Sequence, residues 1–376
     1  MTEEHTSPVP EEDVQQDPTS DVGEMSQWKL IWLRFRRNRL AMGGVALLIV
    51  MYLLVGFAGF VAPNSFQTQN LDFIFGPPMP LALDGLKPHT YAVSTELDQE
   101  NFKWVFVVDR ETKVPIEFFV RGDTYSLLGR ETDLHLFGLP DGARLYLWGT
   151  DSLGRDMFSR TLQGGTVSMT VGLVGITITI FLGSVLGTVS GYFGGFIDDA
   201  MQRMVEVIQS FPTIPLWAAL AAALPNISET FTMLHRYLLI TVILSLVNWT
   251  GLARQLRAKV MSYREADFTS AALVAGASNA RIIFVHMLPN AASHIIVVAA
   301  MSIPSMILGE TALSFLGLGI LPPMVSWGSL LRDAQQVATV VQHPWLILPG
   351  VGVILTVLGF SVLGDGLRDA VDPYSI

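Results

Sequence analysis

The chain has 376 residues, of which 50% are hydrophobic and only 15% are charged, whereas about a quarter of the residues of a soluble domain are charged. A helix that crosses a bilayer needs about 20 mostly apolar residues, and four long stretches contain no Asp, Glu, Lys or Arg: 40–63, 161–197, 287–309 and 334–364. These features exclude a soluble globular protein, and the lack of two-residue alternation excludes a β-barrel, so we predict an all-α polytopic membrane protein.

Most of the net charge of −10 lies at the start of the chain. Residues 1–27 contain eight acidic residues and no Lys or Arg, so we predict a disordered acidic tail. The remaining chain carries a net charge of only −2, and we expect no nucleic-acid partner. There is no cysteine, which excludes disulfides, and the seven histidines lack metal-ligand spacing, so we expect no metal site.

Residues 28–63 are predicted to form a basic lead-in followed by the first transmembrane helix. Five Lys and Arg residues lie in 28–39, and 40–62 is the apolar span. A signal peptide also begins with basic residues, but its apolar core is usually only about 7–15 residues long. This span is longer and lacks a small-residue cleavage site, so we expect it to be retained.

Charged, proline and aromatic residues return in 64–147, which we predict to be a β-rich extramembrane domain inserted between the first two spans. We expect a hairpin with strands at 102–108 and 114–120 around a turn at 109–112. Further strands are expected at 134–137 and 143–147.

The rest of the chain, 148–376, is predicted to be a five-helix core, which brings the total to six transmembrane helices. Its spans are expected at 167–192, 204–224, 237–253, 291–318 and 345–363. Pro212 and Pro215 interrupt the second of these five, and Pro304 lies inside the fourth. Such interruptions are tolerated because neighbouring helices can satisfy the freed backbone groups.

The positions of Lys and Arg in short loops predict the orientation, since these residues favour the cytoplasmic side. The lead-in has five of them, and the loop between the fourth and fifth spans also has five. The loops after the third and fifth spans have one each, Arg236 and Arg332. We therefore expect both termini and the 254–290 loop to be cytoplasmic, and the 64–147 insertion to be extracytoplasmic.

A polar segment rich in small residues, 264–290, lies between two long apolar runs. Its small residues predict a low-relief helix or helix–turn that another protein could approach closely: Ala271, Ala272, Ala275, Gly276 and Ala277. None of the five lysines is followed by Ser or Thr, so the chain has no phosphate-binding P-loop. If ATP drives its activity, a separate subunit must hydrolyse it.

The 264–290 segment resembles the loop by which ABC-importer permeases dock onto their ATPases. Ala271-Ala272, Gly276 and Leu288-Pro289 match the spacing of that loop, and Ser270 stands where a glutamate is usual. The resemblance implies that Ser270, Ala271, Ala272, Gly276, Ala277, Leu288 and Pro289 form the ATPase-docking site.

A second motif precedes the second span: Gly149-Thr150-Asp151-Ser152-Leu153-Gly154-Arg155-Asp156. It is similar to a signature of the dipeptide/oligopeptide permease family, C-type subunit. Three further blocks resemble the same family in order: 191–195 with Phe211-Pro212, 310–328, and 364–373. Together the blocks cover 149–373, and the 64–147 insertion is longer than in ordinary members.

The resemblance implies a permease of a binding-protein-dependent ABC importer of type I architecture. Such a subunit forms half of the translocation pathway in a bacterial inner membrane. Implied partners are a second homologous permease, one or two ATPases that bind ATP and Mg, a periplasmic solute-binding protein, and lipid. The implied solutes are peptides or others of similar size, and some relatives carry oligosaccharides or opines.

Single charged residues allow two interpretations each. An intramembrane carboxylate is costly to bury, so Glu310 is a candidate for the transport pathway, or it is a structural partner of a backbone group or an Arg. Asp151, Arg155 and Asp156 would form either a structural cap on the second span or a contact with the binding protein.

Two other classes of function are open to such a chain. An ion-driven secondary transporter favours inverted repeats and ionisable groups deep in several spans, but only Glu310 lies deep and no repeat is evident. An intramembrane protease would need a Ser–His or Asp pair within the spans. Ser293 and His294 are adjacent in sequence, so on a helix they point to different faces, and we reject that class.

Overall fold

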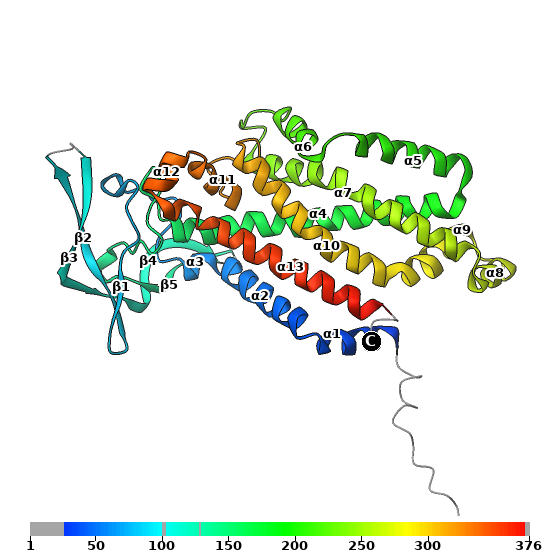
Figure 1. The fold of residues 1–376 in the computed structure, drawn as a ribbon, viewed down its shortest axis with the longest axis horizontal. Coiled ribbons are helices and arrows are strands. Elements are labelled where there is room, and N and C mark those ends of the chain that lie inside the picture. Colours follow the sequence, from blue (N-terminus) through cyan, green and yellow to red (C-terminus); the bar gives the residue numbers. More distant parts are fainter. Residues whose placement is uncertain (1–25, 100–102, 128, 373–376) are drawn as a thin grey trace, which may run out of the picture.

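The computed structural model describes residues 26–99, 103–127 and 129–372. A bundle of long helices carries a small group of β-strands at one end, while the short helices α8 and α9 lie at the opposite end (Figure 1). Residues 1–25, and with them nearly all of the predicted acidic tail, lie outside the described residues.

The basic lead-in and the first span are separate helices. The lead-in is α1 (Gln27–Arg37), and the span consists of α2 (Arg39–Gly56) and the single turn α3 (Ala58–Val61). Asn38 separates the first two, because its backbone is extended and its side chain accepts a hydrogen bond from Ala41 N at 3.1 Å. Arg34 Nη1 donates to the carbonyl oxygen of Asp372 at 3.1 Å, so α1 packs beside the end of the last helix.

The described part of the insertion contains two separate antiparallel sheets, preceded by the short helix η2 (Leu71–Phe73). The first sheet has the order β1 (Leu81–Asp84), β2 (Lys87–Asp98), β3 (Lys103–Pro115). The second pairs β4 (Glu117–Leu127) with β5 (Arg130–Gly138), after which η3 (Pro140–Gly142) leads back to the bundle.

The predicted turn at 109–112 is wrong, because these residues lie inside β3. Tyr91 pairs with Lys113 while Ala92 pairs with Asp109, so residues 110–112 form a bulge. Asp109 accepts hydrogen bonds from Glu111 N at 2.9 Å and Thr112 Oγ1 at 2.7 Å, which is turn-like bonding without a chain reversal.

Two other strand predictions also need correction. The strand expected at 114–120 is divided at Ile116 between two sheets, and 143–147 forms no strand. The expected strand at 134–137 lies within β5 and is confirmed.

The second span is α4 (Met157–Phe193), which begins ten residues before the predicted 167. The next helices are α5 (Gly195–Ser210), α6 (Thr213–Ala222), α7 (Met233–Arg264), α8 (Asp267–Val274), α9 (Asn279–Arg281), the π-helical η4 (Ile282–Met287) and α10 (Leu288–Phe315). The chain ends with α11 (Trp327–Leu331), η5 (Arg332–Ala334), α12 (Val337–Gln342), η6 (Pro344–Ile347) and α13 (Pro349–Val371).

Among the described residues, five helical segments are long and apolar enough to cross a membrane. A sixth crossing exists only if α5 and α6 are counted together, and these helices are bent by 86°. The span expected at 204–224 with an interruption at Pro212 and Pro215 is thus a bent pair of helices that begins earlier, at Gly195. Pro212 explains the break, because proline lacks an N–H and forces the preceding Phe211 into extended backbone (φ −88°, ψ 139°).

Glycines bring α4 and α7 into direct backbone contact. Gly183, Gly187 and Gly191 recur every four residues on α4, and a methyl group on Gly187 would lie 2.5 Å from the carbonyl oxygen of Ala253. Such spacing permits close helix approach inside membranes. Three small residues of α10 pack within this chain: Ala299 and Ala300 are buried, and Gly309 lies against Trp217 and Leu244.

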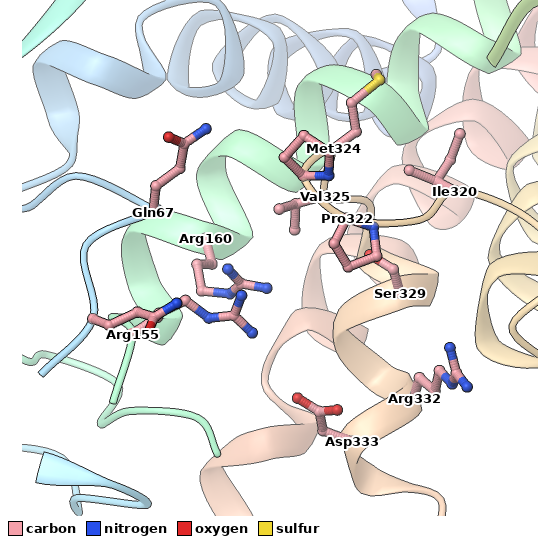
Figure 2. Close-up of a pocket in the computed structure, with 12 residues that line it drawn as sticks. Gln67, Arg155, Arg160, Ile320, Pro322, Met324, Val325, Ser329, Arg332 and Asp333 are labelled. Atoms are coloured by element: carbon pink, nitrogen blue, oxygen red, sulfur yellow. The ribbon is translucent and has the colours of Figure 1, made fainter. Parts of the chain in front are cut away.

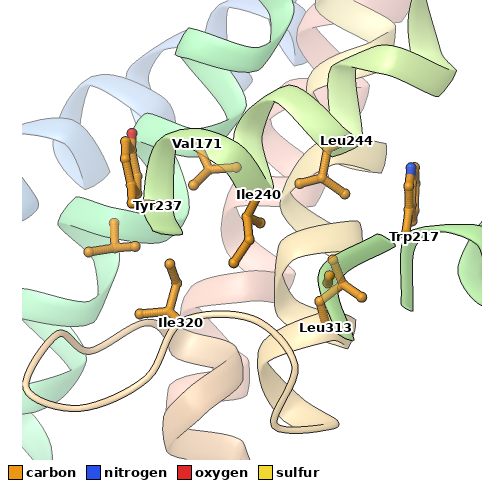
Figure 3. Close-up of a cluster of buried hydrophobic side chains, with 9 residues drawn as sticks. Val171, Trp217, Tyr237, Ile240, Leu244, Leu313 and Ile320 are labelled. Carbon is orange, nitrogen blue, oxygen red and sulfur yellow. The ribbon is translucent and has the colours of Figure 1, made fainter. Parts of the chain in front are cut away.

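A buried hydrophobic cluster joins α6 to the bundle (Figure 3). Trp217 of α6 and Ile240 and Leu244 of α7 pack with Val171 of α4 and Leu313 of α10. The short helix α6 is therefore part of the helical core, although α5 and α6 diverge at their bend.

Candidate functional site

The end of the bundle opposite the β-strands carries the sequence-predicted docking residues. Helix α7 continues eleven residues past its predicted end at 253, and α8 follows after a two-residue break at Glu265 and Ala266. Asp267 lies in the first turn of α8, where a negative charge favours the positive end of the helix dipole. The result is a short helix that protrudes from the bundle (Figure 1).

Gly276 terminates this helix in a left-handed conformation with φ +77°. Its N–H bonds to the carbonyl oxygen of Leu273, and the N–H of Ala277 bonds to that of Ala272, both at 3.0 Å. This pair of bonds is a Schellman cap, which requires a residue that tolerates positive φ. No atom lies within 4 Å of the position where a Cβ of Gly276 would be, so the glycine faces open space.

The two alanines of the motif differ in burial. Ala272 is buried beside Val260, Ile282 and Met287, whereas Ser270 and Ala271 are exposed. The cluster fixes α8 to α7 and to η4, and Thr269 Oγ1 adds a hydrogen bond to the carbonyl oxygen of Tyr263 at 2.8 Å. These contacts anchor α8 to the end of α7 and to η4.

The C-terminal half of α8 exposes apolar side chains, whereas its exposed polar residues are Asp267 and Ser270. Val274 is 91% exposed and Leu273 is 52% exposed, although both lie on a helix outside the apolar part of the bundle. Leu288 and Pro289 open α10 directly after the π-helical turn, with Pro289 exposed and Leu288 half-buried. Exposed apolar side chains on a low-relief helix are typical of a surface that another protein covers.

One charged pair near this end was missed by sequence reasoning. Asp198 of α5 accepts two hydrogen bonds from Arg257 of α7, at 2.5 Å from both Nε and Nη2. Ser190 of α4 donates to the same carboxylate at 2.6 Å. Nothing in the local sequence links Asp198 to a residue 59 positions away, so the sequence alone does not reveal this pair.

The motif 149–156 forms a tight turn at the opposite end of the bundle. Asp151 is fully buried and accepts hydrogen bonds from the backbone of Leu153 and Arg155 and from Arg155 Nε, at 2.8 to 3.0 Å. Gly149 and Gly154 have φ of +69° and +68°, and a Cβ at either would strike backbone atoms of Gly76 and Asn70 respectively. The turn therefore locks the insertion onto the bundle.

Asp156 and Thr150 complete this turn. Asp156 caps α4 by accepting from Phe158 N and Ser159 N, and Asn64 Nδ2 donates to it at 3.1 Å. Burial raises the pKa of this carboxyl to about 6. Thr150 Oγ1 accepts from Gly76 N at 2.7 Å. These contacts favour a structural role for the motif, which also explains why α4 begins at Met157.

Glu310 of α10 is fully buried within the helical bundle. Ser168 of α4 donates to one oxygen at 2.8 Å, and Ser314 of α10 donates to the other at 2.6 Å. Ser168 Oγ in turn accepts from Trp327 N at 3.1 Å, which links the group to α11. This geometry favours the structural interpretation, and a role in the pathway stays a prediction. Among the described residues, no group of three His, Asp or Glu could hold a metal ion.

Comparison with known proteins gives the family. Residues 183–374 match the model of the binding-protein-dependent transport system inner membrane component. Residues 26–78 match the N-terminal transmembrane domain of oligopeptide transport permease C. The chain belongs to this permease family.

Relatives extend the match along the whole permease. This chain is 32% identical over 366 residues to the dipeptide transport system permease protein DppC of Lactococcus lactis, and the alignment covers 95% of this chain and 94% of the relative. The oligopeptide permease protein OppC of Bacillus subtilis is 28% identical over 93% and 90% of the two chains. DppC of Alkalihalophilus pseudofirmus is 40% identical over 60% of this chain and 71% of the relative.

The permease is therefore a multi-pass inner-membrane transport component of the oligopeptide and dipeptide type, and not an enzyme. This assignment excludes the secondary transporter and the intramembrane protease. Its membership in a binding-protein-dependent system implies ATPase and binding-protein partners.

Proposed function

We propose that this permease is one half of the translocation pathway of an ATP-driven peptide importer and that α8 is its ATPase-docking element. The observation that carries the proposal is the exposed apolar surface of α8, closed by the Schellman cap at Gly276. A short helix that presents an apolar face fits a groove on a partner protein. Ser270, Ala271 and Val274 would contact that groove, while Ala272 anchors the helix.

The anchoring gives a route for coupling. Because α8 packs on the end of α7 and on η4 through Ala272, Ile282 and Met287, a displacement of α8 would move α7 and α10 with it. The Asp198–Arg257 pair ties α5 to α7 at the same end, so α5 would follow. ATP and Mg would bind to the partner, and this chain would contribute the mechanical connection.

The proposed topology has six membrane crossings, with the bent pair α5–α6 counted as one. The C-terminal end of α13, together with α1 and α8, would then be cytoplasmic, as would the N-terminus. The β-strands would be periplasmic. The excess of Lys and Arg in the lead-in and in 254–290 supports this orientation. We divide the chain into four regions: the tail 1–27, the basic lead-in with the first span 28–63, the insertion 64–147 and the core 148–376.

The proposed partners are a second homologous permease, one or two ATPase subunits and a periplasmic solute-binding protein. Peptides are the proposed solutes because the relatives that align along most of both chains are named for dipeptide and oligopeptide transport. Import of oligosaccharides or opines by the same machinery would be the alternative.

The substitution Gly276→Leu tests the docking surface. We expect the variant to insert normally, but to lose transport and the stimulation of ATPase activity by loaded binding protein, because leucine would protrude from the docking face. Gly85→Leu is the matched control, since Gly85 also has positive φ (+62°) with nothing near its Cβ position, but lies in the β1–β2 turn. Normal stimulation in Gly276→Leu would contradict the assignment.

A further inference from the structure

A cavity of about 670 Å³ lies at the end of the bundle next to the β-strands. Its walls come from the start of α4, the loop between α10 and α11, and η5 (Figure 2). Arg155 and Arg160 point into the space from one side, and Asp333 faces them from the other. The volume is in the range of small-molecule binding sites, about 300–1,000 Å³.

Arg160 is the deepest charged group of this cavity. It is only 7% exposed, and its Nη1 donates to the carbonyl oxygen of Phe66 at 3.2 Å. Its Nε lies 3.3 Å from Asp151 Oδ2, but no described residue accepts a hydrogen bond from this nitrogen. Since a guanidinium has five N–H donors, most of them remain available beside the cavity.

The charges of the cavity are separated across it. Asp151 lies behind the arginines and forms ion pairs with both, at 2.8 Å from Arg155 Nε and 3.3 Å from Arg160 Nε, so one positive charge of the two arginines stays unbalanced by it. Asp333 lies on the opposite wall, where burial and the charge of Asp151 raise the pKa of its carboxyl against the opposing charges of Arg160, Arg155 and Arg332. Arg332 contributes one further cation at the rim. A ligand with a carboxylate at one end and an ammonium group at the other would match this arrangement.

The remaining wall is largely apolar. Ile320, Pro322 and Met324 line it, and the Gln67 amide lies at its edge. This surface could accommodate a short apolar side chain, while the amide could bond to a peptide group.

We propose that this cavity is an outer subsite of the permease that binds the terminal carboxylate of the transported peptide through Arg160 and Arg155. Asp333 faces the amino end of a short peptide. A single acidic side chain of a docked binding protein would supply the carboxylate but no ammonium for Asp333, so the solute fits better. The inference rests on the proposed import of peptides.

The test measures equilibrium binding of tri-alanine to the assembled permease–ATPase complex in nanodiscs without binding protein. The wild type should bind tri-alanine at least about tenfold more tightly than its C-terminal amide, since charge-assisted hydrogen bonds are lost. Arg160→Gln should lower the affinity for tri-alanine by about the same factor and abolish the preference for the acid. Arg121→Gln, an arginine 84% exposed on β4, should change neither.

A second variant keeps the test valid if Arg160→Gln fails to assemble, because Arg160 also bonds to Phe66. Asp333→Asn should abolish the preference of the complex for tri-alanine over its N-acetyl derivative. Equal wild-type affinity for the acid and the amide would overturn the subsite. So would a loss of binding-protein affinity in Arg160→Gln with unchanged tri-alanine binding, which would assign the cavity to a protein carboxylate.

The proposed function fails by a different result. If complete proteoliposomes with binding protein import no tri-alanine or other peptide, peptide import itself is wrong. If the proteoliposomes import peptide, but Arg160→Gln keeps the preference for tri-alanine over its amide and Asp333→Asn keeps the preference over the N-acetyl derivative, only the subsite is wrong.

Discussion

Arg257 of α7 and Asp198 of α5 form a two-point ion pair, with Nε and Nη2 each 2.5 Å from a carboxylate oxygen. The side chains are 27% and 10% exposed, so the pair is largely shielded from water. Ser190 brings α4 into the same contact. Three helices are thus joined at the end that carries α8, where force from a partner would enter the permease.

We predict that this pair contributes measurably to stability. A double-mutant cycle with Asp198→Asn and Arg257→Gln should give a coupling energy above about 1 kcal/mol, because removing one partner strands a largely buried charge. The same cycle on Arg203 and Glu206, which are 81% and 53% exposed, should give less than about 1 kcal/mol. Thermal unfolding in detergent measures both, and equal couplings would contradict the prediction.

The contact between α4 and α7 should tolerate no added atoms. Gly187→Ala should destabilise the permease by about 1–3 kcal/mol, because the methyl group would overlap the backbone of Ala253. Gly43→Ala is the control, since nothing lies within 4 Å of its Cβ position and alanine favours a helix. The melting temperature should therefore fall in Gly187→Ala but not in Gly43→Ala. An equal change in both variants would refute the close packing.

Asp156 should make stability fall as pH rises. Its pKa is raised to about 6 in the folded chain, above the unfolded value of about 3.9, so the folded state binds the extra proton between these values. The stabilisation is complete at low pH and is lost as pH rises through the folded pKa. From about pH 5 to about pH 7.5 the loss should be roughly 1 kcal/mol.

Asp156→Asn should flatten that dependence, because asparagine keeps the helix cap without a titrating group. Asp84→Asn is the control: Asp84 is exposed, and its hydrogen bond with Lys113 lowers its pKa. Its substitution should leave the pH profile above about pH 5 unchanged. An identical profile for wild type and Asp156→Asn would disprove the assignment.

Apolar runs predicted where the helices lie but not where they end. The uncharged run 161–197 located α4, yet its start depends on the cap at Asp156, which the hydropathy pattern does not reveal. The turn-like sequence at 109–112 formed a bulge, since pairing with β2 outweighed local propensity. The sequence predicted a helix or helix–turn around Gly276 but not its left-handed geometry, which follows from its position at the end of α8.

Cysteine labelling should establish the orientation in this cysteine-free chain. Glu111→Cys in β3 should react with an impermeant thiol reagent from the periplasmic side, whereas Ser262→Cys near the end of α7 should react only after the membrane is permeabilised. Both positions are exposed, so access depends on the side of the membrane. The reverse labelling pattern would invert the proposed topology.

Photocrosslinking from α8 tests the central claim most directly. A photoreactive amino acid replaces Val274, which is 91% exposed on α8, or Leu86, which is 98% exposed in the β1–β2 turn at the opposite end. After irradiation of native membranes, we expect a crosslink from position 274 to the ATPase subunit and none from position 86. A crosslink to the ATPase from position 86, or its absence at 274 in a transport-active complex, would contradict the assignment of α8 as the docking element.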